Sequence, residues 1–469
     1  MERRPPTRSL AYGRQRRATC FNLLLLLEFK DNQDQESAIR ILLVQPYHKS
    51  NVKTRGRIYM SQLTLPLMAA LTPAKHEITV IDENVEPVDF EPDYDLVSIT
   101  ALTPTAPRAY EIADEFRRRG KKVVLGGVQP SLMAGEAAVH ADSVVIGESE
   151  ETWPLLLADL ENGRLKPRYA SDHKPDLAGL PFPRRDLMKE DAYLNIPKVE
   201  TSRGCPFRCS FCSTTVFYGP RMRFRPVEEV VAEVKAADYR FVFFTDNNIT
   251  ANKGYAKRLF KALEPLGVHW LSQGSVDMAD DDELMDLAQK SGCVGMLVGF
   301  ESLSDENIAE MGKKASNRVE EYEEKIRVFH KHRIGLIGCF VFGFDGDDQS
   351  VFRKTVKFIK RNNIDCPQLT VLTPFPGTSL RTELAAQNRI IHSQWEKYDV
   401  GNVTFIPRKM KPEELQAGYN WACEKVYSRL AIIMRGIRSL AYMKSPYRSL
   451  VFTGNSGVYR KLYQVSQQH

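Results

Sequence analysis

The sequence predicts an α/β protein in which two parallel-sheet domains are followed by a mainly helical C-terminal part. First, short apolar runs alternate with helix-length amphipathic segments from about residue 40 to residue 380. Second, the apolar runs are continuous, which is typical of strands covered by helices on both faces. Third, glycines and polar residues follow many of these runs, and such folds bind ligands at the carboxyl ends of their strands.

The composition is that of a globular protein. The chain has 469 residues, of which 43% are hydrophobic and 26% charged, which excludes a disordered, collagen-like or multi-span membrane chain. The eight cysteines form no regular framework, so we expect a reducing compartment, the cytoplasm. Positive charge gathers at the two ends, with net +5 over residues 1–19 and +7 over residues 421–469, while the body between them is −6. The body therefore lacks the excess positive charge that is typical of nucleic-acid-binding proteins, and we expect no nucleic-acid partner.

Residues 1–39 differ from the rest of the chain. They begin with an Arg-rich, Pro-containing stretch that is followed by an apolar run over residues 21–27. This run is too short to span a bilayer, and no cleavage site of small residues follows it. We therefore expect a disordered or atypical extension rather than a secretion signal.

The first domain is expected over residues 40–165. Strands are predicted at residues 41–44, 78–81, 96–100, 123–125 and 144–146, and a helix over residues 109–119 ends at Gly120. The residues at the strand ends are polar or Gly, namely Ser98, Thr100, Thr103, Gly126, Gly127, Gly147 and Glu148. A Gly pair lets the backbone approach a bulky ligand, although a plain strand-to-helix turn would use the same residues.

This arrangement resembles the Rossmann-like, flavodoxin-like cobalamin-binding domain that precedes many radical S-adenosylmethionine (SAM) enzymes. The matching segments are residues 41–46, 82–84, 98–105, 125–131 and 141–152. The resemblance implies cobalamin contacts from the strand-end residues named above and from Gln129. The sequence departs from the family at Val128-Gln129-Pro130-Ser131, where a His is common.

His48 lies in the loop where some cobalamin proteins place an axial histidine. Those proteins have an Asp-x-His-x-x-Gly motif, whereas here Pro46 stands at the Asp position and Asn51 at the Gly position. No adjacent carboxylate is therefore available to orient the imidazole. We expect cobalamin to bind without a histidine ligand from the protein.

The strongest local signal is the spacing Cys-x3-Cys-x2-Cys formed by Cys205, Cys209 and Cys212. Thiolates suit iron–sulfur clusters or zinc. Zinc would need a fourth ligand, and an electron-transfer cluster takes four cysteines, but the next cysteine along the chain is Cys293. Three ligands on a four-iron cluster leave one iron open to bind a cosubstrate.

The triplet looks like the signature of the radical SAM superfamily. The resemblance implies a [4Fe–4S] cluster on these cysteines that reductively cleaves SAM to a 5′-deoxyadenosyl radical. It also implies an external electron donor such as flavodoxin or ferredoxin. By the same resemblance Phe211 lies near the adenine, Asp246 and Asn247 bind the amino group, and Ser275 and Glu301 contact ribose and methionine. Each of these residues can also be read as a polar cap after a buried strand.

The second domain is expected over residues 190–380. Six βα units follow one another, with strands near residues 198–201, 241–244, 269–271, 296–298, 338–342 and 368–372. Six units predict a partial (βα)6 barrel of the TIM type, open on one side, with its chemistry at the carboxyl ends of the strands.

Residues 381–469 form the C-terminal extension. Residues 40–427 are similar to the subgroup that contains hopanoid methylases. A final helix is expected to carry the apolar stripe Val426, Leu430, Ile433, Ile437 and Leu440 with arginines beside it. The stripe has two interpretations: it packs across the open barrel, or it lies on an anionic membrane and so indicates a lipid-like substrate.

The expected function is that of a cobalamin-dependent radical SAM enzyme that methylates an unactivated carbon of a small-molecule or lipid-like substrate. A radical rearrangement or cyclisation that uses cobalamin without methyl transfer is the alternative within enzymes, and a non-catalytic cobalamin or redox sensor is the alternative outside them. A methylthiotransferase is disfavoured, because those enzymes carry a second cysteine set and residues 40–160 contain no cysteine. No catalytic side chain is assigned from the sequence.

Overall fold

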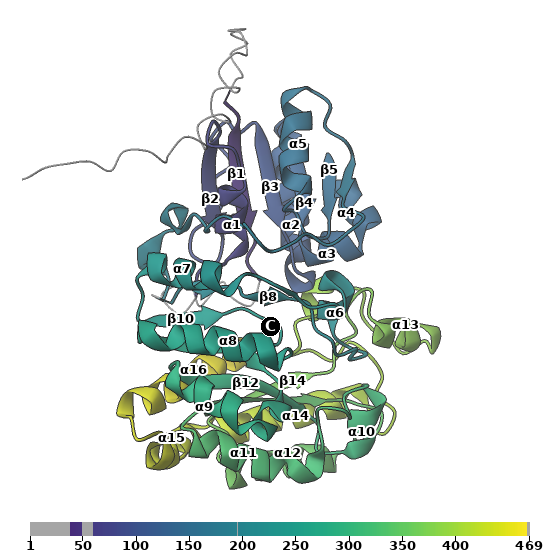
Figure 1. Cartoon of the computed structure of the whole chain (residues 1–469). Helices are drawn as coiled ribbons and strands as arrows, with labels where there is room; N and C mark the ends of the chain where they lie inside the picture. Colours follow the sequence, from purple (N-terminus) through teal and green to yellow (C-terminus); the bar gives the residue numbers. More distant parts are fainter. Residues whose placement is uncertain (1–37, 49–59, 195, 467–469) are drawn as a thin grey trace, which may run out of the picture. The chain divides into compact units, whose positions relative to one another are not determined.

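The computed structural model describes residues 38–48, 60–194 and 196–466 (Figure 1). The prediction of an atypical extension over residues 1–39 therefore lies almost wholly outside the described residues. Residues 38–466 belong to one compact unit of the chain. Two parallel sheets organise this unit.

The first sheet has the strand order β2-β1-β3-β4-β5-β6 and is parallel throughout. Its strands are β1 (Arg40–Gln45), β2 (Glu77–Asp82), β3 (Leu96–Thr100), β4 (Lys122–Gly126), β5 (Ser143–Ile146) and β6 (Arg168–Ala170). The order reverses between β1 and β3, which is the switch point where flavodoxin-like folds bind their ligands. The predicted flavodoxin-like topology is confirmed.

Both faces of this sheet are buried, which explains why its strands are continuously apolar. One face, with Leu42, Val97 and Leu125, packs against α2 (Ala106–Arg118) and α4 (Ala134–His140). The other face, with Ile41 and Val124, packs against α1 (Thr64–Ala70) and α5 (Thr152–Glu161). A short helix, α3 (Val128–Leu132), follows β4 directly.

The second sheet has the order β14-β13-β12-β11-β10-β7, again parallel throughout. Its strands are β7 (Lys198–Val199), β10 (Phe241–Phe244), β11 (His269–Gly274), β12 (Cys293–Glu301), β13 (Gly335–Phe342) and β14 (Cys366–Val371). Strand order follows chain order, as in a barrel rather than a doubly wound sheet. The helices between the strands are α7 (Val227–Ala237), α8 (Lys253–Leu263), α9 (Asp282–Lys290), α10 (Asp305–Glu310), α11 (Tyr322–Lys331) and α12 (Ser350–Arg361). The predicted partial (βα)6 barrel is confirmed.

The cysteine triplet lies on an excursion between two short antiparallel strands, β8 (Ser202–Arg203) and β9 (Arg223–Phe224). The excursion contains α6 (Ser213–Tyr218), which begins directly after Cys212. Because β8 and β9 pair, the two ends of the loop are fixed at the same place.

The C-terminal part is helical, with α13 (Ser379–Ala386), α14 (Pro412–Tyr427), α15 (Arg429–Met443) and α16 (Pro446–Ser466). The expectation of one helix through residues 426–440 is wrong, because the chain leaves the helical conformation at Ser428, whose hydroxyl then caps α15. No helix in the described part of the chain is both long and apolar enough to cross a bilayer.

Helix α16 fills the amino-terminal end of the barrel with one aromatic ring. Phe452 is 1% exposed and packs with Leu271, Val294 and Ile337. Its ring occupies the space that a Cβ atom on Gly335 would need. The barrel is therefore closed at this end by Phe452 and not by the stripe of α15.

We predict that Gly335→Ala lowers the free energy of unfolding by about 1–3 kcal/mol, because the added methyl group overpacks the Phe452 ring. Phe452→Leu in the same chain should recover part of this loss. Gly457→Ala is the matched control: it lies in α16 with open space around its Cα and should cost nothing. Denaturant titration of Gly335→Ala, Phe452→Leu alone, the double variant and Gly457→Ala measures this, and additive losses in the double variant would contradict the packing argument.

Candidate active site between the two sheets

A cavity of about 310 Å³ lies where the carboxyl ends of the first sheet meet the start of the barrel. Six of the eight predicted cobalamin residues line it, namely Ser98, Thr100, Gly126, Gly127, Gly147 and Glu148. From the barrel side, Lys198, Glu200, Arg203 and Tyr218 line the same cavity. Thr103 and Gln129 are buried and are not among the lining residues.

The backbone at Gly127 requires glycine for two reasons. Its φ is +93°, and a Cβ atom would lie 2.7 Å from the Thr100 hydroxyl oxygen and 2.9 Å from the Ala101 backbone nitrogen. The chain thus passes directly against the end of β3 and presents bare backbone to the cavity. Packing against the end of β3 therefore accounts for glycine at this position, and the same residue lines the cavity.

His48 lies apart from this cavity. Its Nε2 is 3.0 Å from the carbonyl oxygen of Glu396, in the segment that precedes α14. No histidine in the described residues lines the cavity. That cobalamin binds without a histidine ligand from the protein therefore stays a prediction, and the position of His48 agrees with it.

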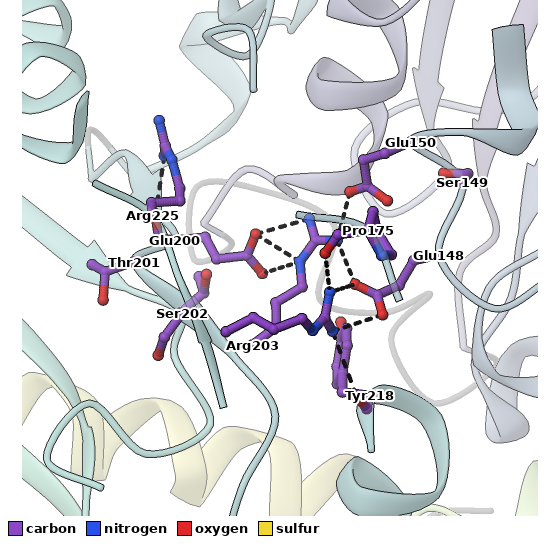
Figure 2. Close-up of polar contacts among 12 residues, drawn as sticks. Glu148, Ser149, Glu150, Pro175, Glu200, Thr201, Ser202, Arg203, Tyr218 and Arg225 are labelled. Carbon is purple, nitrogen blue, oxygen red and sulfur yellow. Dashed lines mark hydrogen bonds and ion pairs between the residues drawn. The ribbon is translucent and has the colours of Figure 1, made fainter. Parts of the chain in front are cut away.

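A buried network of charges joins the two sheets beside the cavity (Figure 2). Arg203 on β8 donates to Glu148 at 2.8 Å and to Glu200 at 2.9 Å, and its guanidinium lies 2.5 Å from Glu150. Arg223 on β9 donates to the same Glu148 at 2.8 Å. The side chains of Glu148 and Arg203 are only 2% and 6% exposed. Both arginines flank the cysteine excursion, so the network attaches that excursion to the loop after β5.

The three cysteines of the excursion are half-buried thiols. Ser210, between them, donates its N–H to the Met311 carbonyl at 3.4 Å, and its own carbonyl accepts from Leu380 at 3.0 Å. Burial raises the pKa of the Cys205 thiol and raises that of Cys209 to about 12, against the opposing effect of Lys313 on Cys209. Metal binding is therefore what would deprotonate these thiols. The described residues contain no group of three or more His, Cys, Asp or Glu side chains placed closely enough to hold a single metal ion.

The predicted SAM residues lie on loops at the carboxyl end of the barrel, and two of their carboxylates are already engaged. Asp246 is fully buried and accepts hydrogen bonds from the Thr201 hydroxyl at 2.7 Å and from the Ser202 hydroxyl. Burial raises the pKa of Asp246 to about 6. Glu301, at a left-handed φ of +64°, accepts from Lys313 at 2.6 Å.

The other three predicted SAM residues have looser surroundings. The amide oxygen of Asn247 accepts from Thr214 on α6 at 3.3 Å, which brings the end of β10 against the cysteine excursion. The ring of Phe211 lies edge-on to Phe344, which follows β13, with 6.2 Å between ring centroids. Ser275 bonds to Asp277 in the turn after β11.

Comparison with known proteins finds a matching family for each of the two sheet domains. Residues 63–157 match the B12 binding domain, and residues 199–359 match the radical SAM superfamily. The chain is 34% identical over 415 residues to bacteriochlorophyllide d C-12(1)-methyltransferase of Chlorobaculum tepidum, covering 86% of this chain and 90% of that protein. The chain belongs to the cobalamin-dependent radical SAM enzymes.

A second relative and one solved structure are also named as methyltransferases. The bacteriochlorophyllide d C-8(2)-methyltransferase of the same organism is 31% identical, over 86% of this chain and 93% of its own. The structure of the radical SAM methyltransferase TsrM from Kitasatospora setae superposes with a TM-score of 0.66 at 17% identity, over 92% of this chain and 100% of that chain, which shows a shared fold. This cobalamin-dependent radical SAM enzyme is accordingly a methyltransferase whose cofactors are cobalamin, SAM and a [4Fe–4S] cluster.

The residues of this radical SAM enzyme fit these cofactors on two observations. The cavity at the carboxyl ends of the first sheet is lined by backbone at Gly126, Gly127 and Gly147, which suits a bulky ligand. Three thiols on one loop, with no fourth cysteine in that loop, suit a four-iron cluster with one open iron.

Three charged residues beside the site, Arg203, Arg223 and Lys313, were not predicted from the sequence. Arg203 and Arg223 carry no spacing signal, although Arg203 stands two residues before Cys205. Lys313 is a buried lysine that binds Glu301 and also donates to the Gly299 carbonyl at 3.2 Å. A lysine in a polar stretch normally indicates a surface, so its burial could not be read from the sequence.

We predict that Cys205→Ala, Cys209→Ala and Cys212→Ala each abolish reductive SAM cleavage. Anaerobically reconstituted wild-type protein should hold about four irons per chain, since three thiolates and SAM complete a four-iron cluster. Cys423→Ala, at a buried cysteine on α14, is the control and should keep cleavage. Full cleavage by any one of the three loop variants would refute the ligand assignment.

We also predict that Arg203→Met destabilises the fold by about 3–5 kcal/mol and lowers cobalamin occupancy, because buried Glu150 loses its partner and Glu148 keeps only Arg223 and Lys174. Arg118→Met removes an exposed, solvent-screened ion pair of the first domain and should leave the stability close to that of wild type. Thermal unfolding and the absorbance of bound cobalamin report the two effects. Equal behaviour of the two variants would show that the buried network is dispensable.

Proposed function

We propose that this enzyme methylates an unactivated side-chain carbon of a chlorophyllide-like tetrapyrrole. The observation that carries the proposal is the nearly full-length match to two proteins named as methyltransferases of bacteriochlorophyllide d, at 34% and 31% identity. Hopanoid C-2 methylase of Rhodopseudomonas palustris, which supports a lipid-like substrate, is 22% identical over 84% of this chain. The macrocycle is therefore the better supported substrate class.

A ring-forming reaction is the second candidate, and one comparison favours it. The anaerobic magnesium-protoporphyrin IX monomethyl ester cyclase of Rubrivivax gelatinosus is 25% identical over 69% of this chain. This protein covers only 63% of that relative, whereas it covers 90% and 93% of the two methyltransferases. Methylation is therefore preferred over cyclisation.

The bound cofactors supply the methyl group and the radical that removes hydrogen from the substrate carbon. The chain contributes position and exclusion of water. Glu148, Arg203 and Arg223 hold the cysteine excursion against the first sheet, so the two cofactor sites keep a fixed separation. Backbone at Gly126, Gly127 and Gly147 lines the cavity that would receive the macrocycle, and the Lys313–Glu301 pair places a compensated charge near Cys209.

We propose the individual site residues as follows. Cys205, Cys209 and Cys212 ligate the cluster, and Ser98, Thr100, Gly126, Gly127, Gly147 and Glu148 surround cobalamin. Phe211, Asn247 and Ser275 contact SAM. For Asp246 and Glu301, whose carboxylates already accept hydrogen bonds, a role in fixing the loops that contact SAM is equally supported.

We further propose a cytoplasmic enzyme that takes its electrons from a flavodoxin or ferredoxin and contacts the membrane peripherally. The half-buried, unpaired thiols need a reducing compartment. Each SAM cleavage consumes one electron, and the chain's three-cysteine motif provides one cluster site.

Product analysis tests the substrate proposal. Reconstituted enzyme with cobalamin, SAM carrying a deuterated methyl group, and a chemical reductant is given bacteriochlorophyllide d or a hopene. We expect one labelled methyl group on the macrocycle and none on the hopene, with 5′-deoxyadenosine formed in step with product. The Cys209→Ala variant is the control. Labelled hopene, or unlabelled ring closure of the tetrapyrrole, would contradict the proposal.

A further inference from the structure

Helix α15 is attached to the barrel by its polar face. Ser439 and Tyr442 donate their hydroxyl hydrogens to the buried Asp365, which precedes β14. Buried Arg435 donates to the Val426 carbonyl at 2.6 Å, and Gly436 lets α16 approach closely at Thr453. Hydrogen bonds, a small residue and the buried Met443 at the end of α15 therefore dock this helix, and the apolar residues between Leu430 and Leu440 are not needed for that contact.

Except for Met443, the large apolar side chains of α15 face outward instead. Leu430 is 70% exposed, and Ile433 and Ile437 are each 56% exposed. The surface continues onto the start of α16, where Leu450 is 69% exposed. We call this set the apolar face; its members are Leu430, Ile433, Met434, Ile437, Leu440, Tyr447 and Leu450. The interpretation that the stripe packs across the barrel is wrong for every member except Val426, which is buried on α14.

A positively charged groove of about 850 Å³ adjoins the apolar face between α12, α14 and α15. The two surfaces meet at Arg438, an exposed residue of α15 that lines the groove and donates to the Lys360 carbonyl at 3.0 Å. In the part of the chain that the structure describes, no acidic residue lines the groove, and Glu323 lies 3.3 Å from Arg361 at its rim. The groove is lined by Arg353, Val356, Lys357, Lys360, Arg361, Asn363, Trp421, Lys425 and Arg438.

From these two surfaces we infer that α15 and the basic groove bind the surface of an anionic phospholipid bilayer. A helix that lies in the membrane plane buries its apolar face among the acyl chains while flanking basic residues pair with phosphate groups. The six Lys and Arg of the groove provide that charge, and the outward leucines and isoleucines provide the inserted area. A second copy of the chain would bring the two basic grooves close together and is disfavoured by like-charge repulsion.

The inference rests on the peripheral contact proposed above but not on the methyl-transfer reaction. The apolar face and the basic groove lie outside the barrel, on α12, α14, α15 and the start of α16 (Figure 1). The predicted cofactor residues lie at the opposite, carboxyl ends of the strands. Lipid binding and SAM cleavage can therefore fail separately.

Vesicle sedimentation at low salt tests the inference with the full-length, cofactor-loaded enzyme. Wild-type protein should sediment with vesicles that contain phosphatidylglycerol, sediment less with pure phosphatidylcholine, and be released by salt. Arg353→Glu with Lys357→Glu should weaken the partition constant at least about tenfold, because basic residues near an anionic surface contribute about 1 kcal/mol each. Ile433→Ser with Ile437→Ser should weaken it similarly by removing the inserted area.

Matched variants in the cobalamin-binding domain control for charge and apolarity. Arg164→Glu with Arg168→Glu makes the same charge change, and Val139→Ser with Leu155→Ser removes two equally exposed apolar side chains. Both controls should sediment as wild type, and all variants should keep SAM cleavage. Three results would overturn the inference. They are no sedimentation of wild type with anionic vesicles, unchanged sedimentation of both the groove variant on α12 and the apolar-face variant on α15, or a wild-type dimer that Ile433→Ser with Ile437→Ser converts to a monomer.

Discussion

The buried guanidinium of Arg203 is the interaction on which the arrangement of this enzyme depends. It lies between carboxylates of both sheets, Glu148 and Glu150 from the first and Glu200 from the second. A charge this deeply buried is stable only with its partners in place, so the network tolerates one relative position of the two domains much better than others. Arg203 also begins the excursion that contains the cysteine triplet, which ties the cluster loop to that position.

Two parallel sheets then present their reactive edges to a shared space. Ligand sites in such sheets form at the carboxyl ends of strands, because loops and helix starts converge there. In this chain the edge of the flavodoxin-like sheet and the start of the barrel enclose one cavity. Glycines of the first sheet line this cavity on one side, and Phe217 and Tyr218 of the cysteine excursion line it on the other.

The C-terminal helices α15 and α16 have different roles. Helix α16 inserts Phe452 into the amino-terminal end of the barrel, where Gly295 and Gly335 leave room for its ring. Helix α15 docks through hydrogen bonds of Ser439 and Tyr442 to Asp365 and through the buried Met443, and its other large apolar side chains stay outside. Hydrogen bonds to a buried carboxylate thus stabilise a helix whose hydrophobic surface remains available.

The sequence by itself determined both sheets and the cysteine site, because each depends on local spacing. Continuous apolar runs such as residues 96–100 indicate strands buried on both faces, and the triplet needs only eight residues. Tertiary structure alone decided the rest. Arg203 meets Glu148 across 55 positions, and Lys313 is buried because it meets Glu301. The stripe of α15 was visible in the sequence, but periodicity shows that a helix has an apolar face and not which face it packs. That choice depends on distant partners such as Asp365, whose position only the folded chain sets.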